Sequence, residues 1–289
     1  MEIRIAESAG FCFGVKRAVN LVYKEAAESE RVYTMGPIIH NEHVVEDLAK
    51  KGVRIIDDDM ICREEGGKPG PGATVIIRSH GVSEEEMQAL KSSGYRLIDA
   101  TCPFVQKIHK IVSKMSGEGC PVIIIGNSSH PEVIGIRGHV RGEDCAVIET
   151  EAEARAYRGD FGKTICIVSQ TTFNFQKFQE LVEIIKTLGY HVVVTNTICS
   201  ATRERQTEAM ELAAASDVML VIGGSQSSNT QKLYDICCGQ CRRTYFVTGP
   251  EDLRDLRFQA GDRIGITAGA STPNTIIQEV SQHVRRAEL

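Results

Sequence analysis

Three cysteines head three copies of one sequence pattern, and this repeat constrains the fold more than any other feature of the chain. From Cys12, Cys102 and Cys199, a glycine follows at the same offset of 24 residues and a polar residue at an offset of 28. The glycines are Gly36, Gly126 and Gly223, and the polar residues are His40, His130 and Ser227. Repetition at a long fixed period indicates a chain built from related structural units. Three such units around one axis would bring the three thiols to one point, which suggests a metal.

Short runs rich in valine and isoleucine alternate with helical patterns along the 289 residues. Such runs are typical of strands buried on both faces of a parallel sheet. Strands are expected at residues 3–6, 32–35, 74–77, 97–99, 122–125, 164–168, 191–195, 218–222, 244–247 and 262–266. Their alternation with helices predicts an α/β fold with mostly parallel sheets. The equal offsets favour three pseudo-threefold-related α/β modules, at 1–93, 94–188 and 189–289, over one continuous doubly wound sheet or a barrel.

Several residues predict where helices begin and end. Ser83 followed by Glu86 predicts a capping box, in which each side chain accepts a hydrogen bond from the other residue's backbone N–H. Pro131 and Pro273 are each expected at the first position of a helix. Gly189 is expected just past the end of one.

Composition and charge exclude several classes of protein. The net charge of −5 gives no support to non-specific nucleic-acid binding. No apolar stretch is long enough to span a bilayer, and the first residues lack the apolar run of a secretory signal. The chain is therefore expected to be cytoplasmic, with its ten cysteines as thiols, metal ligands or small buried residues rather than disulfides. The Gly- and Pro-rich stretch 66–72 predicts a surface turn.

The three repeated cysteines each lie near the start of a predicted helix, where a thiolate is favoured. A lone cysteine is ordinarily a small buried residue, but three at equivalent positions favour a metal site. Structural zinc sites usually contain closely spaced cysteine pairs, which these positions lack. An iron–sulfur cluster held by three thiolates leaves one iron open, and an open position serves substrate rather than structure. A second dense group, Cys237, Cys238 and Cys241, is expected to end a helix with one buried face rather than to bind a metal.

Polar residues follow the predicted strands at the edge where open α/β proteins bind ligands. Helix N-termini at this edge present N–H groups and positive dipole ends, which suit anions. The candidate residues for a phosphate-type anion are His40, His80, His130, Ser227, Ser228, Asn229 and Ser271. The remaining histidines are expected to be structural or exposed: His43, His109, His139, His191 and His283. No Walker A or G-x-G-x-x-G motif is present, so nucleotide binding is not indicated.

Glu132 lies in the first turn of the helix expected after His130. It is either a surface residue that compensates the helix dipole or a proton donor at the centre, with a pKa raised by exclusion of water. The spacing alone does not decide between these two roles. Thr171 belongs to the same inner rim, because it follows its strand as His80 follows the equivalent strand of the first module.

Together these residues resemble the 4-hydroxy-3-methylbut-2-enyl diphosphate reductases, iron–sulfur enzymes of the methylerythritol phosphate route to isoprenoids. The resemblance runs in order and nearly end to end. It is carried by Gly10-Phe-Cys12-Phe-Gly-Val, Gly36-Pro-Ile-Ile-His40-Asn, Arg78-Ser-His80-Gly, Asp99-Ala-Thr-Cys102-Pro, His130-Pro-Glu132-Val, Ser169-Gln-Thr171-Thr, Asn196-Thr-Ile-Cys199, Ser227-Ser-Asn229 and Thr267-Ala-Gly-Ala-Ser271. The group Cys237, Cys238 and Cys241 is not part of the shared pattern.

The resemblance implies a trefoil of three α/β modules around one [4Fe–4S] cluster. Cys12, Cys102 and Cys199 would hold the cluster, and its fourth iron would be open to the substrate oxygen. The three histidines with Ser227, Ser228, Asn229 and Ser271 would grip the diphosphate of the substrate. Thr171 would order a water molecule or the substrate hydroxyl, and Glu132 would deliver protons.

The implied reaction is the reductive dehydroxylation of (E)-4-hydroxy-3-methylbut-2-enyl diphosphate to isopentenyl and dimethylallyl diphosphate. Two electrons would arrive from reduced ferredoxin or flavodoxin, and the chain is expected to act as a monomer with no nucleic-acid or membrane partner. Three alternatives stay open: a cluster-dependent hydratase that needs no reductant, an iron–sulfur sensor or carrier protein, and a zinc-stabilised binding module.

Overall fold

The computed structural model describes residues 2–56 and 72–286, so Cys62 and all of the predicted turn except Gly72 lie outside the described residues. The chain forms two compact units. The first unit comprises Met1–Lys16, His40–Val44 and Cys199–Leu289, and the second comprises Arg17–Ile39 and Val45–Ile198. The predicted second module, 94–188, lies within the second unit, whereas the predicted first and third modules each contribute residues to both units.

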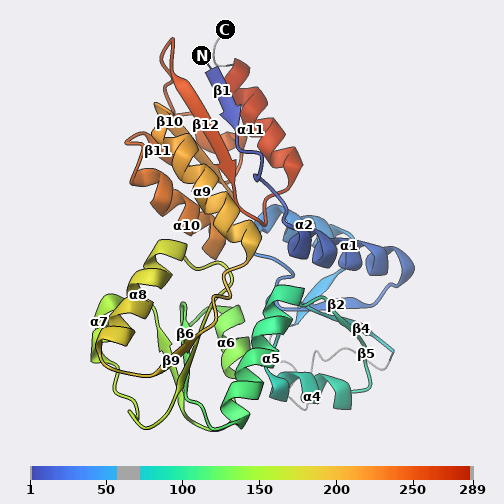
Figure 1. The fold of residues 1–289 in the computed structure, drawn as a ribbon. Helices are drawn as coiled ribbons and strands as arrows, with labels where there is room; N and C mark the ends of the chain where they lie inside the picture. The colour runs from blue at the N-terminus through green and yellow to red at the C-terminus, as the bar shows by residue number, and fades with distance from the viewer. Residues whose placement is uncertain (1, 57–71, 287–289) are drawn as a thin grey trace. The chain divides into compact units, whose positions relative to one another are not determined.

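The described strands form three four-stranded sheets in which every pairing is parallel (Figure 1). The strands are β1 (Glu2–Ile5), β2 (Val32–Met35), β3 (Arg54–Ile56), β4 (Thr74–Ile77), β5 (Arg96–Asp99), β6 (Val122–Ile125), β7 (Cys145–Ile148), β8 (Ile165–Ser169), β9 (Val192–Val194), β10 (Val218–Ile222), β11 (Thr244–Val247) and β12 (Arg263–Ala268). The predicted α/β class with parallel sheets is confirmed.

Helices connect and cover these strands. They are α1 (Phe13–Glu28), α2 (Glu42–Lys50), α4 (Glu84–Ser92), α5 (Pro103–Gly117), α6 (Pro131–Arg137), α7 (Glu151–Ala156), α8 (Phe175–Thr187), α9 (Ser200–Ala214), α10 (Ser228–Cys238), the 3₁₀ helix η1 (Pro250–Leu253) and α11 (Asn274–Arg286). None of the described helices is long and apolar enough to cross a membrane.

One strand order recurs in all three sheets. The second unit contains the sheets β3-β2-β4-β5 and β7-β6-β8-β9, and the first unit contains β11-β10-β12-β1. Within each sheet the four strands can be counted in the order of the repeat, so that β10, β11, β12 and β1 are the first to fourth strands of the last sheet. The second strand then lies at one edge of each sheet, next to the first, and the third and fourth follow. The fourth strand of the last sheet is the N-terminal strand β1, which pairs with β12. The sequence repeat is thus a repeat of topology, with the two ends of the chain completing one sheet.

The repeated residues occupy equivalent places in this topology. Gly36, Gly126 and Gly223 directly follow β2, β6 and β10, the first strand of each set. The cysteines lie between the fourth strand and the helix that follows it. Strands β5 and β9 lie past residues 93 and 188 but pair with β4 and β8 of the preceding sheet. The module boundaries stay a prediction, and each sheet draws its last strand from beyond its predicted module.

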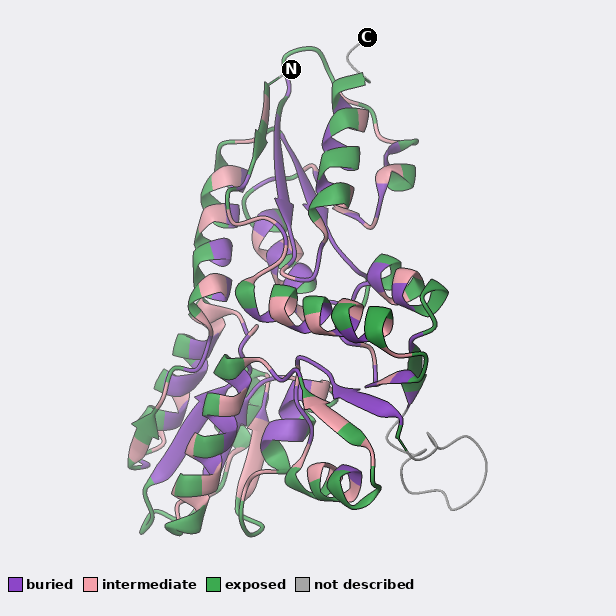
Figure 2. Cartoon of the chain, turned by 90° about the vertical axis from the view of Figure 1, so that its right-hand side faces the viewer, coloured by how far each residue is buried: buried purple, intermediate pink, exposed green. Residues whose placement is uncertain are grey.

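In the sheet of the first unit, the central strand β10 is buried on both faces, as its continuous apolar run requires. In β10, Leu220 and its alternate neighbours pack in one cluster with Val280 of α11. Val221 on the opposite face packs with Ala209 of α9 and Leu233 of α10. Successive residues of a strand point to opposite faces, so this run needs helices on both sides. Figure 2 shows the buried strands between helices whose outer faces are exposed.

Most of the predicted helix starts and ends are confirmed. Ser83 and Glu86 form the predicted capping box, Pro131 begins α6, and Gly189 follows α8 with a positive φ of 90°. Helix α11 begins one residue after Pro273, although the N–H of Ile277 already donates to the Pro273 carbonyl. Two strands were not expected, β3 and β7. Both are edge strands: β3 has only three residues and begins with Arg54, and in the apolar run of β7 only Ile148 is fully buried.

Candidate functional site

The predicted polar residues all lie beyond the carboxyl ends of parallel strands. In the second unit, His80 follows β4, His130 and Glu132 follow β6, and Thr171 follows β8. In the first unit, Ser227, Ser228 and Asn229 follow β10, Ser271 follows β12, and His40 precedes α2. This is the edge at which α/β proteins bind their ligands.

Glu132 is buried and is held by Thr171. Only 2% of Glu132 is exposed, although it stands in the first turn of α6. The backbone N–H of Thr171 donates to Oε1 at 2.6 Å, and the Thr171 hydroxyl donates to Oε2 at 2.7 Å. Of the two roles that the sequence left open, the surface role is therefore wrong.

Burial makes this carboxyl a weak acid. Removal from water raises the pKa of Glu132 from 4.5 to about 7, although the two hydrogen bonds from Thr171 act in the opposite direction. A carboxyl with such a pKa carries its proton part of the time at neutral pH. A buried, shifted carboxyl at a ligand-binding edge is typical of a general acid.

The two histidines of the second unit lie together. The rings of His80 and His130 meet edge to face, with centroids 5.3 Å apart. His130 caps α6, and its Nδ1 accepts a hydrogen bond from the backbone N–H of Glu132 at 3.1 Å. An accepting Nδ1 assigns the proton of the neutral ring to Nε2. His130 and Glu132 are thus fixed relative to each other by the start of one helix.

Hydroxyl groups gather in the first unit at the start of α10. Ser227 caps this helix by accepting a hydrogen bond from the N–H of Thr230. The Ser271 hydroxyl lies 3.2 Å from Ser227 Oγ and 3.2 Å from the His40 carbonyl oxygen. Ser227 and Ser271 are both buried. The loops after β10 and β12 and the segment at His40 therefore meet at one helix N-terminus, which suits an anion.

Asn229 adds an unpaired amide to this group. Only 4% of the residue is exposed, and within the described part of the chain neither Oδ1 nor Nδ2 has a hydrogen-bond partner. A buried polar group without a partner costs about 1–3 kcal/mol. Most such groups in proteins are satisfied, so an exception calls for an explanation. A ligand that supplies the missing partners would explain this one.

The three repeated cysteines stand at helix N-termini, as predicted. Cys102 and Cys199 are the N-cap residues of α5 and α9, and Cys12 directly precedes α1. All three are partly buried thiols rather than disulfides. Cys12 and Cys199 belong to the first unit and Cys102 to the second. In α9, Cys199 Sγ accepts from the N–H of Thr202 at 3.3 Å.

Arg205 is a buried cation within the electrostatic influence of Cys12 and Cys199, and the sequence did not single it out. It is 3% exposed, and it donates to the carbonyl groups of Ser8 and Gly10, so it ties the loop before Cys12 to helix α9. Burial lowers its pKa, and the charges of Cys12 and Cys199 are the main opposing influences. Its Nη1 is buried with no partner among the described residues. The sequence signal for this residue was only its place in the helix that Cys199 caps, six residues after that cysteine.

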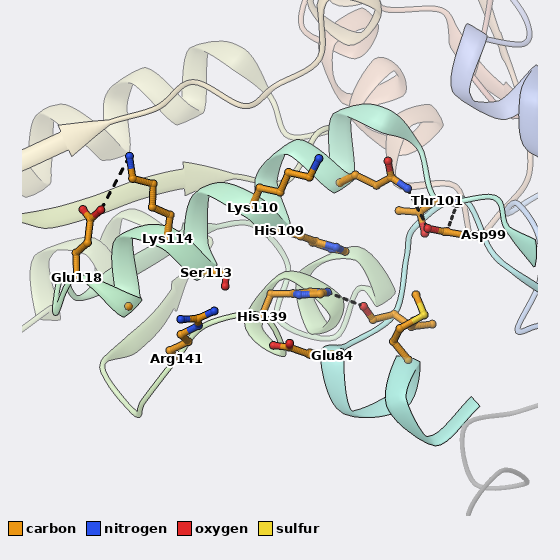
Figure 3. A pocket seen from close by; sticks show the side chains of 14 residues that line it. Glu84, Asp99, Thr101, His109, Lys110, Ser113, Lys114, Glu118, His139 and Arg141 are labelled. Carbon is orange, nitrogen blue, oxygen red and sulfur yellow. Dashed lines mark hydrogen bonds and ion pairs between the residues drawn. The ribbon is translucent and has the colours of Figure 1, made fainter. Parts of the chain in front are cut away.

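Within the described part of the chain, the cysteines of the second dense group and the other histidines are either packed against neighbouring residues or exposed. Cys237 and Cys241 are buried in the core beside α9, and Cys238 is exposed at the end of α10. Burial raises the pKa of Cys237 to about 12, and the charges of Cys238 and Cys241 act in the same direction. His109 stacks on His139 with ring centroids 4.0 Å apart, at a wall of the cavity in Figure 3.

Comparison with known proteins gives one consistent result. The family model described as LytB protein matches residues 3–285. The chain is 44% identical over 287 residues to a 4-hydroxy-3-methylbut-2-enyl diphosphate reductase of Caldanaerobacter subterraneus subsp. tengcongensis, covering 99% of this chain and 97% of the relative. It is 42% identical over 289 residues to the protein of that name from Aquifex aeolicus, covering 99% and 96%.

Two solved structures are similar over nearly the whole chain. One is described as (E)-4-hydroxy-3-methyl-but-2-enyl diphosphate reductase, the terminal enzyme of the non-mevalonate pathway. It is 42% identical with a TM-score of 0.69, and the match covers 99% of both chains. The other is the E-1-hydroxy-2-methyl-but-2-enyl-4-diphosphate reductase from Plasmodium falciparum, 27% identical with a TM-score of 0.86, covering 99% of this chain and 87% of that one. Sequence and structure agree over the full length, and this chain belongs to the LytB protein family.

Proposed function

We propose that this protein is a 4-hydroxy-3-methylbut-2-enyl diphosphate reductase. It takes (E)-4-hydroxy-3-methylbut-2-enyl diphosphate, two electrons and two protons, and releases water with isopentenyl or dimethylallyl diphosphate. The relatives of this name match the chain over its full length. The observation that carries the proposal is the buried pair of Glu132 and Thr171, because loss of a hydroxyl group as water needs a nearby acid.

The diphosphate binds to the polar residues beyond the strand ends. In the first unit these are His40, Ser227, Ser228, Asn229 and Ser271, and in the second His80 and His130. Hydroxyls, imidazoles and helix N–H groups are suitable donors for phosphate oxygens. The unpartnered amide of Asn229 supports the assignment, since a bound phosphate oxygen would accept from Nδ2. Binding at the unreactive end of the substrate orients the allylic hydroxyl for reaction.

The protein's own residues fit a [4Fe–4S] cluster held by Cys12, Cys102 and Cys199. Each thiol stands at a positive helix end, and a buried cation, Arg205, faces the charges of two of them. Nη1 of Arg205, which has no hydrogen-bond partner among the described residues, leaves a donor for an anionic group. When bound, a cluster with three thiolate ligands supplies electrons and an open iron that acts as a Lewis acid.

Glu132 supplies protons and Thr171 positions the reacting group. With a pKa of about 7, the Glu132 carboxyl can hold a proton at neutral pH and release it. The Thr171 hydroxyl touches Oε2 and can hydrogen-bond a substrate hydroxyl or a water molecule with its remaining capacity. Reduced ferredoxin or flavodoxin is the proposed electron donor. The monomeric state and the cytoplasmic location stay predictions.

The test is an anaerobic assay of purified, iron- and sulfide-reconstituted protein with the allylic diphosphate. We expect about four iron atoms per chain, visible cluster absorbance and product only when a reductant is present. Cys102→Ser should lose the absorbance, whereas Cys238→Ser, at an exposed cysteine outside the repeat, should keep it. Product without reductant would favour a hydratase. A cluster that forms without affinity for the diphosphate would favour a sensor, and a colourless zinc protein would favour a binding module.

A further inference from the structure

Helix α5 is unusual in its charge. Alone among the described α-helices it carries basic residues and no acidic one, with Lys107, Lys110 and Lys114 in its 15 residues. Every other described α-helix contains at least one Asp or Glu. The whole chain has a net charge of −5, so α5 is a local reversal of the protein's charge.

The three lysines form one exposed stripe. With 3.6 residues per turn, positions 107, 110 and 114 fall within about 60° of one another around the helix. All three are exposed, and the opposite face is buried through Val105, Ile108 and Val112. Figure 3 shows the amino groups of Lys110 and Lys114 on the same side of α5. This lysine stripe therefore projects away from the core of the second unit.

Repulsion between neighbouring lysines of the stripe destabilises helix α5. Lysines three and four positions apart repel each other by about 0.2–0.5 kcal/mol per pair. Lys114 pairs with Glu118 at 3.9 Å, beyond the last turn of the helix. Neither Lys107 nor Lys110 forms an ion pair in the part of the chain that the structure describes. An anionic partner would relieve this repulsion.

The stripe begins next to a proposed cluster ligand. Cys102 is the N-cap of α5, and a rise of 1.5 Å per residue puts Lys107 about 8 Å and Lys114 about 18 Å further along the axis. Phe104, in the first turn, is 41% exposed. An exposed aromatic side chain flanked by charged residues is the usual composition of a protein interface, with an apolar centre and a polar rim.

The adjacent cavity does not by itself select an anion. It has a volume of about 780 Å³, and α5 forms one wall (Figure 3). Its charged lining residues are Lys110, Lys114, Arg141, Glu84, Asp99 and Glu118. Acids and bases are equal in number there, so a small anion has no net attraction to it. Lys110 and Lys114 belong to the cavity wall, whereas Lys107 does not line the cavity. The lysine stripe as a whole is therefore a feature of the exposed face of α5, which suits a large surface rather than a small ligand.

We propose that Phe104 and the lysine stripe form the docking surface for an electron-carrier protein with an acidic surface around its redox group. The inference rests on the proposed function, which consumes two electrons in a chain with no nucleotide-binding motif. Two reduced carriers dock in turn, and each is oxidised by one electron. The two electrons and two protons convert the allylic alcohol to the alkene and water. Such redox encounters bury little area and depend on charge for their rate of association.

The experiment compares two electron sources for one set of variants. The test protein combines Lys107→Gln, Lys110→Gln and Lys114→Gln. The control combines Lys24→Gln, Lys50→Gln and Lys91→Gln, three exposed lysines on other helices, so both proteins lose the same charge. Turnover of the allylic diphosphate is measured with a reduced, acidic ferredoxin or flavodoxin and with dithionite plus methyl viologen.

We expect kcat/KM for the carrier protein to fall by about tenfold or more in the test protein and to lose most of its dependence on salt. Turnover with the chemical reductant should equal that of the unmodified protein, and the control should behave normally in both assays. Unchanged carrier-driven turnover in the test protein, or an equal loss in the control, would overturn the docking proposal. Absence of turnover with the chemical reductant in the unmodified protein would instead overturn the proposed function.

Discussion

The Glu132 carboxylate binds two different kinds of donor on the same residue, Thr171. Oε1 accepts from the backbone N–H, which can only donate, at 2.6 Å. Oε2 contacts the hydroxyl, which can donate or accept, at 2.7 Å. A protonated carboxyl must donate its hydrogen, so the proton belongs on Oε2 and the Thr171 hydroxyl must then accept it. This pair can therefore pass a proton outward through the threonine without moving the backbone.

The first prediction concerns this hydroxyl. Thr171→Val keeps the shape of the side chain and the backbone hydrogen bond but removes the proton-accepting oxygen. We expect kcat to fall by roughly 10²-fold or more, within the range for loss of proton-transfer assistance. Thr171→Ser retains the hydroxyl and should recover most of the activity. A steady-state assay with the chemical reductant measures both, and equal activity of the valine and serine variants would contradict the relay.

Glu132→Gln should separate binding from turnover. Glutamine can still accept a hydrogen bond from the Thr171 N–H but cannot supply a proton. We expect turnover to fall by roughly 10²–10⁴-fold, while the dissociation constant for the diphosphate and the cluster absorbance stay close to normal. Glu151→Gln, at an exposed position on α7, is the matched control. Normal turnover of Glu132→Gln would remove this residue from the proton path.

The raised pKa of Glu132 also predicts how stability depends on pH. The carboxyl has a pKa of about 7 when folded and an ordinary value of 4.5. Between these values the folded protein holds the proton that the unfolded chain has lost, so the free energy of unfolding falls as pH rises. The loss corresponds to about 3 kcal/mol between pH 4 and pH 8.

Chemical denaturation of the unmodified protein and Glu132→Gln at several pH values tests this sign. The glutamine variant lacks the titrating group. The free energy of unfolding of the variant minus that of the unmodified protein should therefore increase as pH rises from about 4 to about 8, and level off above that range. A difference that is constant with pH, or that decreases as pH rises, would show that the Glu132 carboxyl has no raised pKa.

Parallel sheets could be predicted from the sequence because both faces of each central strand are buried. The central strands at 32–35, 74–77, 122–125 and 218–222 agree with the structure residue for residue, and so does the edge strand at 244–247. Other predicted ends differ by one or two residues. The edge strands β3 and β7 were not predicted. Strand β3 has only three residues and begins with Arg54, and β7 is a short apolar run in which only Ile148 is fully buried. The pairing of β1 with β12 could not be seen in local patterns, because nothing in either strand specifies its neighbour.

For the candidate site, the sequence predicted where along the chain its residues stand but not the contacts that they make. Equivalent positions in the repeat identified the cysteines and the residues at strand ends, because the repeat places them at one edge of each sheet. The burial of Glu132 was not predictable, because it depends on Thr171, which is 39 residues away. Arg205 was missed because its partners at Ser8 and Gly10 are almost 200 residues away.

Asn229 allows a prediction in which stability and binding change in opposite directions. Asn229→Leu replaces an amide that has no hydrogen-bond partner in residues 2–56 and 72–286 by an apolar side chain of similar size. Removal of an unsatisfied buried group should leave the ligand-free protein as stable or raise its free energy of unfolding by about 1 kcal/mol. The increase in melting temperature on addition of inorganic pyrophosphate should be lost. A variant that is strongly destabilised without ligand, yet still stabilised by pyrophosphate, would show that the amide is structural.

Arg205 should act on the cluster through its charge. Arg205→Gln removes the buried cation that faces Cys12 and Cys199, and Arg205→Lys keeps it. A positive charge favours the reduced, more negative state of a nearby cluster, so the glutamine variant should have a lower midpoint potential and the lysine variant a nearly normal one. Both variants disturb the hydrogen bonds to Ser8 and Gly10, and both should unfold more readily. Anaerobic redox titration of the cluster absorbance distinguishes charge from packing: equal potentials in the two variants would mean that Arg205 only holds the loop before Cys12.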